Sequence, residues 1–338
     1  MSKGFHVAIV GATGAVGQEL MTVLQERNFP ISDLKLLASA RSQGKKLSFC
    51  NEELTVFQAK PDSFQGVDIA FFAGGPISKE LVPEAVKRGA VVVDNSSAFR
   101  LDPDVPLVVP EVNPDDVKKH KGIISNPNCS TTIFVVPLKP IHQIAKVKRA
   151  VVTTMQAVSG AGREAVDELL LQTRQVLAGE KVNQPQVFDH QIAFNLIPHI
   201  DVFDENGYSR EEMKLLYETR KILHDPEIQI TATTVRVPVL RSHSESVNIE
   251  TERMLTAQEA REVLRNAPGI IVQDDPENLQ YPMPLFTSNR DEVFVGRIRK
   301  DFSQEQGLNY WIVSDQLRKG AATNAIQIAE LLCSRNLL

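Results

Sequence analysis

The sequence has few cysteines, no excess of basic residues and no long apolar run. Its cysteines, Cys50, Cys129 and Cys333, are too few and too widely spaced for a disulfide framework or a zinc site, so we expect no metal. Lys and Arg number 37 against 42 Asp and Glu, and this net charge of -5 argues against a nucleic-acid partner. No run approaches the roughly 18 apolar residues of a membrane span, and the N-terminus lacks the pattern of a signal peptide. We therefore expect a cytoplasmic protein with no nucleic-acid or membrane partner.

The chain is long enough for one large or two medium domains, and its first third is typical of a parallel sheet. It has 338 residues, of which 42% are hydrophobic and 23% charged, as in ordinary globular proteins. Short apolar runs separated by helical spacing lie at Val7–Val10, Leu34–Ala38, Val67–Ala73 and Val91–Asp94. Buried strands alternating with helices predict a doubly wound, Rossmann-type parallel sheet. Ile123–Ser125 is a further predicted strand.

After residue 128 the pattern changes to longer strands, which predict a mixed or antiparallel sheet. The predicted strands are 150–158, 228–237, 246–252 and 292–300. Helices are predicted at 163–177, 209–223, 257–266 and 320–333; Ser209 and Glu212 have the spacing of a capping box. The sequence has no internal repeat, and no flexible linker lies between the two regions. We therefore place the domain boundary inside compact structure, near Cys129.

A glycine-rich turn follows the first predicted strand. Gly11, Gly14 and Gly17 have the spacing GxxGxxG and precede a predicted helix. Glycines there let backbone N–H groups approach a pyrophosphate at the helix N-terminus. An ordinary tight turn is the alternative, but the strand before and the helix after favour a dinucleotide site.

The end of the second strand indicates which dinucleotide is bound. An NAD site usually has an acidic residue here for the ribose 2′-hydroxyl, whereas this chain has Ser39 and Arg41. A guanidinium can pair with a 2′-phosphate. The alternative is that this segment is only a solvated loop, as we would expect of the following Lys45 and Lys46. We favour NADP over NAD.

Cys129 lies in a turn that leads into a predicted helix. A thiol at a helix N-terminus sees the positive end of the helix dipole, which lowers its pKa and favours the nucleophilic thiolate. A buried structural cysteine is the usual alternative. Cys50, expected in a strand, and Cys333, expected in an amphipathic helix, fit that alternative.

Five motifs together resemble the aspartate-semialdehyde dehydrogenase family. They are Gly-Ala-Thr-Gly-Ala-Val-Gly (11–17), Asn-Ser-Ser-Ala-Phe-Arg (95–100), Asn-Pro-Asn-Cys-Ser-Thr-Thr (126–132), Gln-Ala-Val-Ser-Gly-Ala-Gly (156–162) and Arg-Val-Pro-Val-Leu-Arg-Ser-His (236–243). The similarity runs over nearly the whole chain. It implies NADPH-dependent reduction of L-aspartyl 4-phosphate to L-aspartate 4-semialdehyde and phosphate, through a cysteine thioester, in lysine, threonine, methionine and diaminopimelate biosynthesis. It further implies a homodimer or homotetramer.

The resemblance also implies a role for each site residue. Cys129 is the expected nucleophile, Gln156 orients the substrate, and His243 is the acid and base. The remaining substrate-binding residues are Arg100 and Lys214 for phosphate, Glu211 for the amino group, Arg236 for the α-carboxylate, and Asn128. The expected cofactor-binding residues are Gly11, Thr13, Gly14, Ala15, Val16, Gly17, Ser39, Arg41, Ser159, Gly160 and Asn324.

Asn324 implies that the C-terminal helix returns to the cofactor domain. The expected domains are therefore residues 1–128, completed by a C-terminal helix at 315–338, and a catalytic and dimerisation domain of α+β type with a mixed sheet at 129–314. Two alternatives stay open. One is another acyl-phosphate reductase, such as the N-acetyl-glutamyl-phosphate type, and the other is a non-catalytic NADP-binding regulator.

The residues around His243 give some of these roles a physical basis. Arg236 and His243 are an odd number of residues apart and would face opposite sides of one regular strand. Pro238 should break the strand and could let both side chains reach one pocket. Glu211 and Lys214 share a helix face, and without the family pattern a surface salt bridge would explain them. We interpret His199 as structural.

Overall fold

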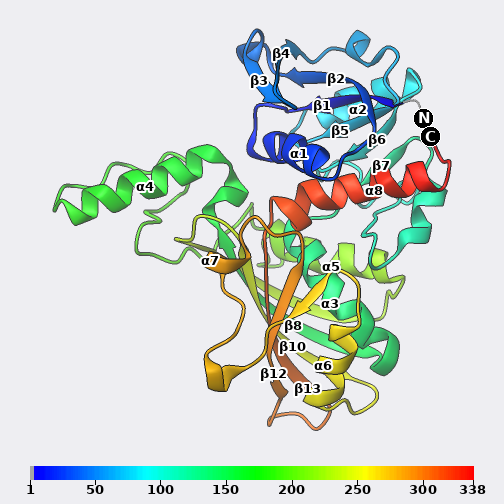
Figure 1. Ribbon diagram of the computed structural model, residues 1–338. Coiled ribbons are helices and arrows are strands. Elements are labelled where there is room, and N and C mark those ends of the chain that lie inside the picture. Colours follow the sequence, from blue (N-terminus) through cyan, green and yellow to red (C-terminus); the bar gives the residue numbers. More distant parts are fainter. Residues whose placement is uncertain (1–3) are drawn as a thin grey trace. The chain divides into compact units, whose positions relative to one another are not determined.

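The computed structural model describes residues 4–338 and divides them into two compact units (Figure 1). The first unit contains the chain up to Asn128 together with Ala321–Leu338, and the second contains Cys129–Gly320. The chain returns to the first unit at Ala321, six residues after residue 315, where the C-terminal helix was expected to begin. Asp315–Gly320 remain in the second unit because their hydrogen bonds go to its loops. No helix among residues 4–338 is long and apolar enough to cross a membrane.

The first unit has a seven-stranded sheet in the order β3-β4-β2-β1-β5-β6-β7. Its strands are β1 (Phe5–Val10), β2 (Ile31–Ala38), β3 (Lys46–Phe49), β4 (Glu52–Gln58), β5 (Ile69–Phe72), β6 (Val91–Asp94) and β7 (Ile123–Ser125). All neighbours pair in parallel except β3, which is antiparallel to β4 at the edge. The strand order runs outward from β1 through β2 on one side and continues with β5 on the other side. The switch point where such sheets bind ligands therefore lies at the carboxyl ends of β1 and β5.

Helices cover both faces of this sheet. On one face α1 (Ala15–Glu26) and α8 (Thr323–Ser334) pack against Val7, Ile9 and Leu36. On the other face, a core that includes α2 (Ser78–Lys87) packs against residues such as Val10. The strands therefore have apolar side chains on both faces, as the continuous apolar runs predict.

The second unit has a mixed six-stranded sheet in the order β11-β12-β13-β10-β8-β9. Its strands are β8 (Val147–Ala157), β9 (Gln229–Val237), β10 (His243–Thr251), β11 (Ile270–Val272), β12 (Val293–Lys300) and β13 (Gly307–Ser314). β8 is parallel to β9 and β11 to β12, whereas the central pairs are antiparallel. The two-domain α/β architecture agrees with the fold class expected from the sequence.

One face of this sheet is covered by α3 (Cys129–Ala145), α5 (Arg210–Leu223) and α6 (Ala257–Arg265). The side chains alternate accordingly: Val152 and Val247 on that face are buried, whereas Thr153 and Ser246 on the other face are partly or fully exposed. α4 (Arg163–Leu177) projects from the sheet at the left of Figure 1, and the short α7 (Pro284–Thr287) lies in the connection to β12.

Several predicted elements are confirmed and others differ at their ends. α4 has the predicted bounds, and α5 begins after Ser209, whose side chain and that of Glu212 form the capping box. β10 starts at His243, three residues before the predicted strand, because it pairs with β8 and β13 on both sides. The terminal helix begins as a π-helix at 318–322. Cys50 is not in a strand but in the exposed turn between β3 and β4.

Candidate active site

The glycine-rich turn joins β1 directly to α1. Gly11 has φ +85°, a conformation that glycine adopts without strain. A side chain at Gly17 would clash with the carbonyl oxygen of Gly11 and lie 2.7 Å from Cα of Ala12. Gly14 is the N-cap of α1 and provides no side-chain cap, so backbone N–H groups are exposed to an incoming anion. The start of α1 thus suits a pyrophosphate, and the absence of a side chain at Gly17 lets the helix pack against the backbone of Gly11 and Ala12. Thr13, Ala15 and Val16 lie in the same turn and first helical residues.

A hydrogen bond joins this turn to the segment after β2. Oγ of Ser42 lies 3.3 Å from Oγ1 of Thr13. Ser42 ends a short 3₁₀ segment, Ala40–Ser42, that contains Arg41 and follows Ser39. The fold therefore brings the glycine turn and Arg41 to one edge of the sheet, although they lie almost thirty residues apart in the chain.

Cys129 is the first residue of the seventeen-residue helix α3 and is partly exposed. The turn before it is held by Asn126, whose side chain donates to Oδ1 of Asn95 and accepts from the amide of Asn324. Arg100 donates to the backbone carbonyls of Asn126 and Asn95, at 2.9 and 2.7 Å. Neither Asn95 nor Asn126 is among the site residues expected from the sequence, although both lie in the family motifs at 95–100 and 126–132. Asn128, the last residue of this turn, is buried.

Three of the expected site residues lie side by side at the ends of three neighbouring strands. Gln156 at the end of β8 is the register partner of Arg236 on β9, and the backbone N–H of Ala157 donates to Nδ1 of His243 at 3.1 Å. A Cβ on Gly160 would lie 3.1 Å from both Nη1 of Arg236 and Cε1 of His243. The strand does break at Pro238, since β9 ends at Val237 and His243 begins a separate strand. Arg236 and His243 meet because β9 and β10 lie on opposite sides of β8.

Gln156 has a defined orientation in this row. Its Oε1 accepts from the hydroxyl of Thr154 at 3.0 Å, so the amide nitrogen faces the other way. That nitrogen donates to Oε1 of Glu211 at 3.2 Å and lies 3.5 Å from Nε2 of His243. Glu211 on α5 is thereby joined to the strand row, a contact that the helix pattern by itself did not predict.

Arg236 is almost completely buried and forms specific contacts. Its Nη1 donates to the carbonyl of Ala157 at 2.8 Å, and the guanidinium carbon lies 5.8 Å from the centre of the Phe188 ring. Burial lowers the pKa of Arg236, while the negative charges of Glu211 and Cys129 raise it. A guanidinium in this position favours a thiolate at Cys129 by the same attraction.

His243 is completely buried. Burial lowers its pKa well below the ordinary value, and the nearby charge of Arg236 lowers it further. Because Nδ1 accepts a backbone hydrogen bond, the proton of the neutral ring is on Nε2. His199, by contrast, pairs with Asp189 at 3.3 Å and stacks on Phe203 at 4.5 Å, as expected of a structural histidine.

Lys214 lies between two carboxylates. Its Nζ is 2.9 Å from Oε2 of Glu211 and 2.9 Å from Oδ2 of Asp201. Burial would lower the pKa of Lys214, but these two carboxylates raise it above its ordinary value. Asp201, which sequence analysis missed, lies in a loop with φ +67° and gives no sequence signal. Ser159 and Gly160 follow β8, and the hydroxyl of Ser159 accepts from Gln316 at 2.6 Å.

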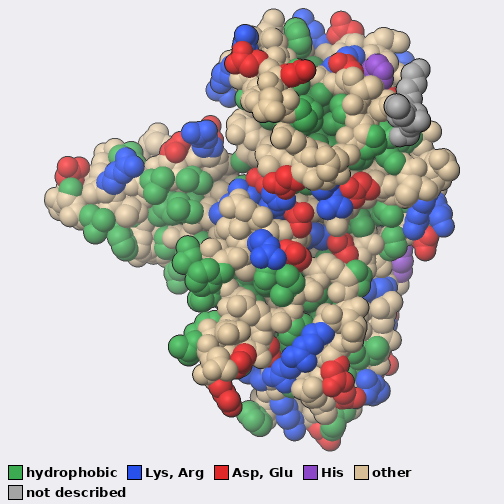
Figure 2. All heavy atoms as spheres, viewed as in Figure 1, with side chains coloured by type: hydrophobic (Ala, Val, Ile, Leu, Met, Phe, Trp, Pro, Cys, Tyr) green, Lys and Arg blue, Asp and Glu red, His purple; other side chains and the backbone are tan. Residues whose placement is uncertain are grey.

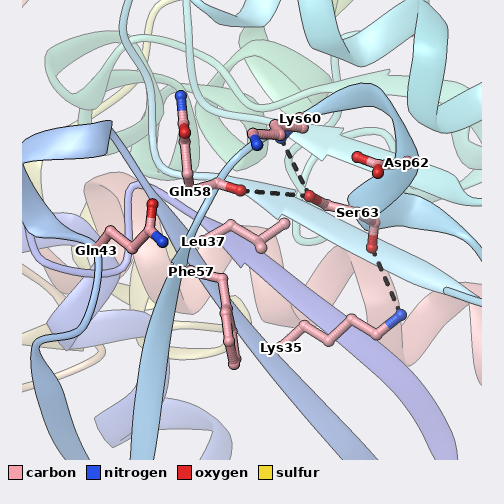
Figure 3. Close-up of a pocket in the computed structure, with 8 residues that line it drawn as sticks. All are labelled: Lys35, Leu37, Gln43, Phe57, Gln58, Lys60, Asp62 and Ser63. Carbon is pink, nitrogen blue, oxygen red and sulfur yellow. Dashed lines mark hydrogen bonds between the residues drawn. The ribbon is translucent and has the colours of Figure 1, made fainter.

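A separate open pocket lies on the first unit and contains none of the expected site residues. It has a volume of about 410 Å³ and is formed around Lys35 and Leu37 of β2 and Phe57 of β4 (Figure 3). The Nζ of Lys35 donates to the carbonyl of Gln65 at 2.8 Å. The amine of Lys35 is therefore already hydrogen-bonded to the backbone. This open pocket offers no cluster of groups comparable to the row of Gln156, Arg236 and His243.

Comparison with known proteins identifies the family. Residues 6–120 match the family model "Semialdehyde dehydrogenase, NAD binding domain", and residues 138–319 match "Semialdehyde dehydrogenase, dimerisation domain". The aspartate-semialdehyde dehydrogenase of Aquifex aeolicus is 60% identical over 99% of this chain and all of its own length.

Two solved structures are similar over almost the whole chain. The aspartate semialdehyde dehydrogenase II of Vibrio cholerae complexed with ASA has a TM-score of 0.95 and 46% identity, covering 98% of this chain and 99% of its own. The enzyme of Candida albicans with NADP has a TM-score of 0.78 and 28% identity, covering 99% and 100%. The expected family, fold class and enzyme class are confirmed. The chain is therefore an oxidoreductase with a nicotinamide coenzyme and belongs to the aspartate-semialdehyde dehydrogenase family.

Proposed function

We propose that this chain reduces L-aspartyl 4-phosphate to L-aspartate 4-semialdehyde with release of phosphate, using NADPH and a thioester on Cys129. One observation carries the proposal: Cys129 begins α3 in the same compact unit as the row of Arg236, Gln156 and His243. The full-length similarity to aspartate-semialdehyde dehydrogenases supports the same substrate.

Cys129 performs the covalent chemistry. Its thiolate attacks the acyl carbon, and a C–S bond forms as the C–O bond to phosphate breaks and phosphate leaves with the electron pair. NADPH, when bound, supplies the hydride that reduces the thioester. As the C–S bond then breaks, the aldehyde leaves and Cys129 returns to the thiolate. The start of α3 and the charge of Arg236 both favour that thiolate.

His243 exchanges the proton at the reacting oxygen. Its Nε2–H is available because Ala157 occupies Nδ1, and this N–H can donate to the oxygen as negative charge develops there. The proton returns to Nε2 as the carbonyl re-forms. The hydrogen bond from Ala157 also fixes the plane of the ring, so orientation and protonation state depend on one backbone contact.

Three further residues orient the substrate. We assign the α-carboxylate to Arg236, whose planar guanidinium can hold it by two hydrogen bonds. Glu211 is assigned to the amino group, and Gln156 to the acyl group and its thioester. In support, the amide nitrogen of Gln156 lies between Glu211 and His243.

Arg100 and Lys214 are the proposed phosphate contacts, and Asn128 is a further proposed substrate contact. The buried Arg100 already donates to two backbone carbonyls, which fix the plane of its guanidinium. Lys214 remains cationic because Glu211 and Asp201 raise its pKa. A fixed guanidinium and a held ammonium suit a phosphate that must bind and leave without rearranging the site.

We propose NADPH as the preferred coenzyme. Thr13 and Ser42 join the glycine turn to the segment that contains Ser39 and Arg41, so a ribose 2′-phosphate at the end of β2 would meet a hydroxyl and a guanidinium. The other coenzyme contacts are proposed at residues 11–17 and at Ser159, Gly160 and Asn324. Asn324 would act indirectly, because its amide nitrogen donates to Val108 and Asn126.

The second unit is the proposed site of homodimerisation. The match to a dimerisation-domain model supports this. Figure 2 shows hydrophobic side chains along α4, where Leu170, Leu171 and Leu177 are 39%, 45% and 77% exposed. Apolar side chains gathered on a surface are typical of a protein interface. We expect a homodimer that acts in the cytoplasm, and equilibrium sedimentation of the purified chain would measure its mass.

The test is an assay in the reverse direction. Purified protein is mixed with aspartate semialdehyde, phosphate and NADP, and nicotinamide absorbance is followed. We expect turnover that requires phosphate and is much faster with aspartate semialdehyde than with N-acetyl-glutamate semialdehyde. Preference for the second aldehyde would assign the chain to the other acyl-phosphate reductases. NADP binding with neither aldehyde turned over would indicate a regulator and refute the proposal.

A further inference from the structure

The segment Asp315–Gly320 contacts the loops on each side of the catalytic row. It follows β13 and enters a π-helix at Arg318. The backbone N–H of Gly320 donates to the carbonyl of Asp315 at 3.3 Å, the i to i−5 bond of a π-helix. Such one-turn insertions are uncommon and often lie at functional sites.

The first part of the segment holds the loop that leads to His243. Asp315 is completely buried, and its carboxylate accepts from Nε of Arg241 and from the backbone N–H of Leu317. The backbone N–H of Ser242 donates to Oε1 of Gln316 at 2.9 Å. Ser242 has φ +73°, a strained conformation for a serine, so the hydrogen bond to Gln316 holds the residue before His243 in an unfavourable conformation.

Gln316 also holds the loop after Gln156. Its amide nitrogen donates to Oγ of Ser159 at 2.6 Å, so one buried side chain bonds both loops. An amide can do this because it has both a donor and an acceptor at one end. An apolar residue of the same length would release both loops.

Gly320 packs against Cys129 itself. A Cβ on Gly320 would lie 2.9 Å from Cβ and 3.3 Å from Cα of Cys129. Its φ is not in the left-handed region, so alanine fits the backbone there and only the space is missing. The residue that would have to move is the proposed nucleophile.

We propose that Asp315–Gly320 is a positioning element that fixes the Cys129 thiol relative to the His243 loop, with Gln316 and Gly320 as positioning residues. Their positioning role depends on the proposed function of Cys129 and His243. A displacement of about 1 Å in a reacting group can lower a rate about 100-fold. Gln316 and Gly320 act through other residues and need not touch the substrate.

The first experiment replaces Gly320 by alanine. We expect kcat to fall about 10- to 100-fold with little change in KM. The rate of Cys129 alkylation by iodoacetamide, measured from pH 6 to 9 in a Cys50→Ser, Cys333→Ser background, should change in parallel. Gly179→Ala is the control, because its added methyl meets nothing within 4 Å. It should leave both rates unchanged, although Gly179 has φ +69°.

A second measurement separates a contact with Cys129 from general damage to the fold. Gly320→Ala should lower Tm in the native background and much less in a Cys129→Gly background, where the clashing Cβ is absent. An equal loss of Tm in both backgrounds would overturn the role of Gly320. This comparison needs no catalysis, so it stays informative even if the assigned reaction is wrong.

The third measurement tests Gln316. Gln316→Met should lower kcat about tenfold and change the alkylation rate of Cys129. Gln175→Met is the matched control: Gln175 is a buried glutamine on α4 that accepts from the backbone N–H of Asn183. Both variants should lose Tm, but only the first should lose kcat. If folded Gln316→Met turns over at the native rate, Gln316 is structural and the proposal fails.

Discussion

Replacing Arg236 by lysine keeps the positive charge and removes the planar fork of the guanidinium. One nitrogen of Arg236, Nη1, already donates to the carbonyl of Ala157, so the guanidinium can hold this carbonyl and a substrate carboxylate together. A lysine ammonium at the same depth is a point charge and cannot present two parallel N–H groups to the carboxylate. The variant should lose about one hydrogen bond to a charged group.

The magnitude follows from that one lost bond. A hydrogen bond to a charged group contributes about 1.5–3 kcal/mol. Since about 1.4 kcal/mol is a factor of ten, KM for aspartate semialdehyde should rise roughly 10- to 150-fold. The KM values for phosphate and NADP should change little. Burial of a strongly hydrated ammonium adds a cost in stability, which Glu211 limits because its carboxylate lies in the same cluster.

The assay measures KM for each reactant at saturating concentrations of the other two. Arg290→Lys is the matched control, because Arg290 also lies over a phenylalanine ring, at 5.4 Å from the centre of Phe294, and pairs with Glu292 at the surface. The control should retain native kinetics. If Arg236→Lys shows native KM for aspartate semialdehyde, or if all three KM values rise equally, Arg236 does not bind the carboxylate.

Four further predictions test the other parts of the site. Cys129→Ser should abolish turnover and keep NADPH binding, as measured by fluorescence titration; substantial residual activity would exclude a thioester at this residue. Arg41→Ala should raise KM for NADPH far more than KM for NADH, and an equal change would refute its contact with the 2′-phosphate. His243→Gln should lower kcat about 10²- to 10⁴-fold while His199→Gln is nearly native, and the opposite result would show that the wrong histidine was chosen. Burial, and then the charge of Arg236, lower the pKa of His243 in the folded protein, so as pH falls the imidazole is protonated first in the unfolded chain, and stability is lost below about pH 6.5. His243→Gln should therefore lose less Tm than the native protein between about pH 7 and pH 5. Equal losses of Tm would contradict the burial of a neutral ring.

The sequence determined the features that depend on near neighbours in the chain. The apolar runs predicted the parallel strands because both faces of such strands are buried, and Ser209 with Glu212 predicted the start of α5 through a cap that spans three residues. The glycine turn and the helix start at Cys129 were equally local. Family motifs, rather than spacing, identified Glu211 and Lys214.

Only the tertiary structure decided which of these residues meet. Arg236 and His243 share a site because β9 and β10 flank β8, and that strand order is set by pairing between residues far apart in the chain. Arg241, which lies in the same sequence motif as Arg236, is instead paired with Asp315, which lies 74 residues later. The hydrogen bond that sets the protonation of His243 comes from the backbone of Ala157, and a backbone donor leaves no signal in the sequence because every non-proline residue has one. The sequence therefore specified which groups are chemically capable, and the long-range packing of the second sheet decided which of them lie close enough to act together.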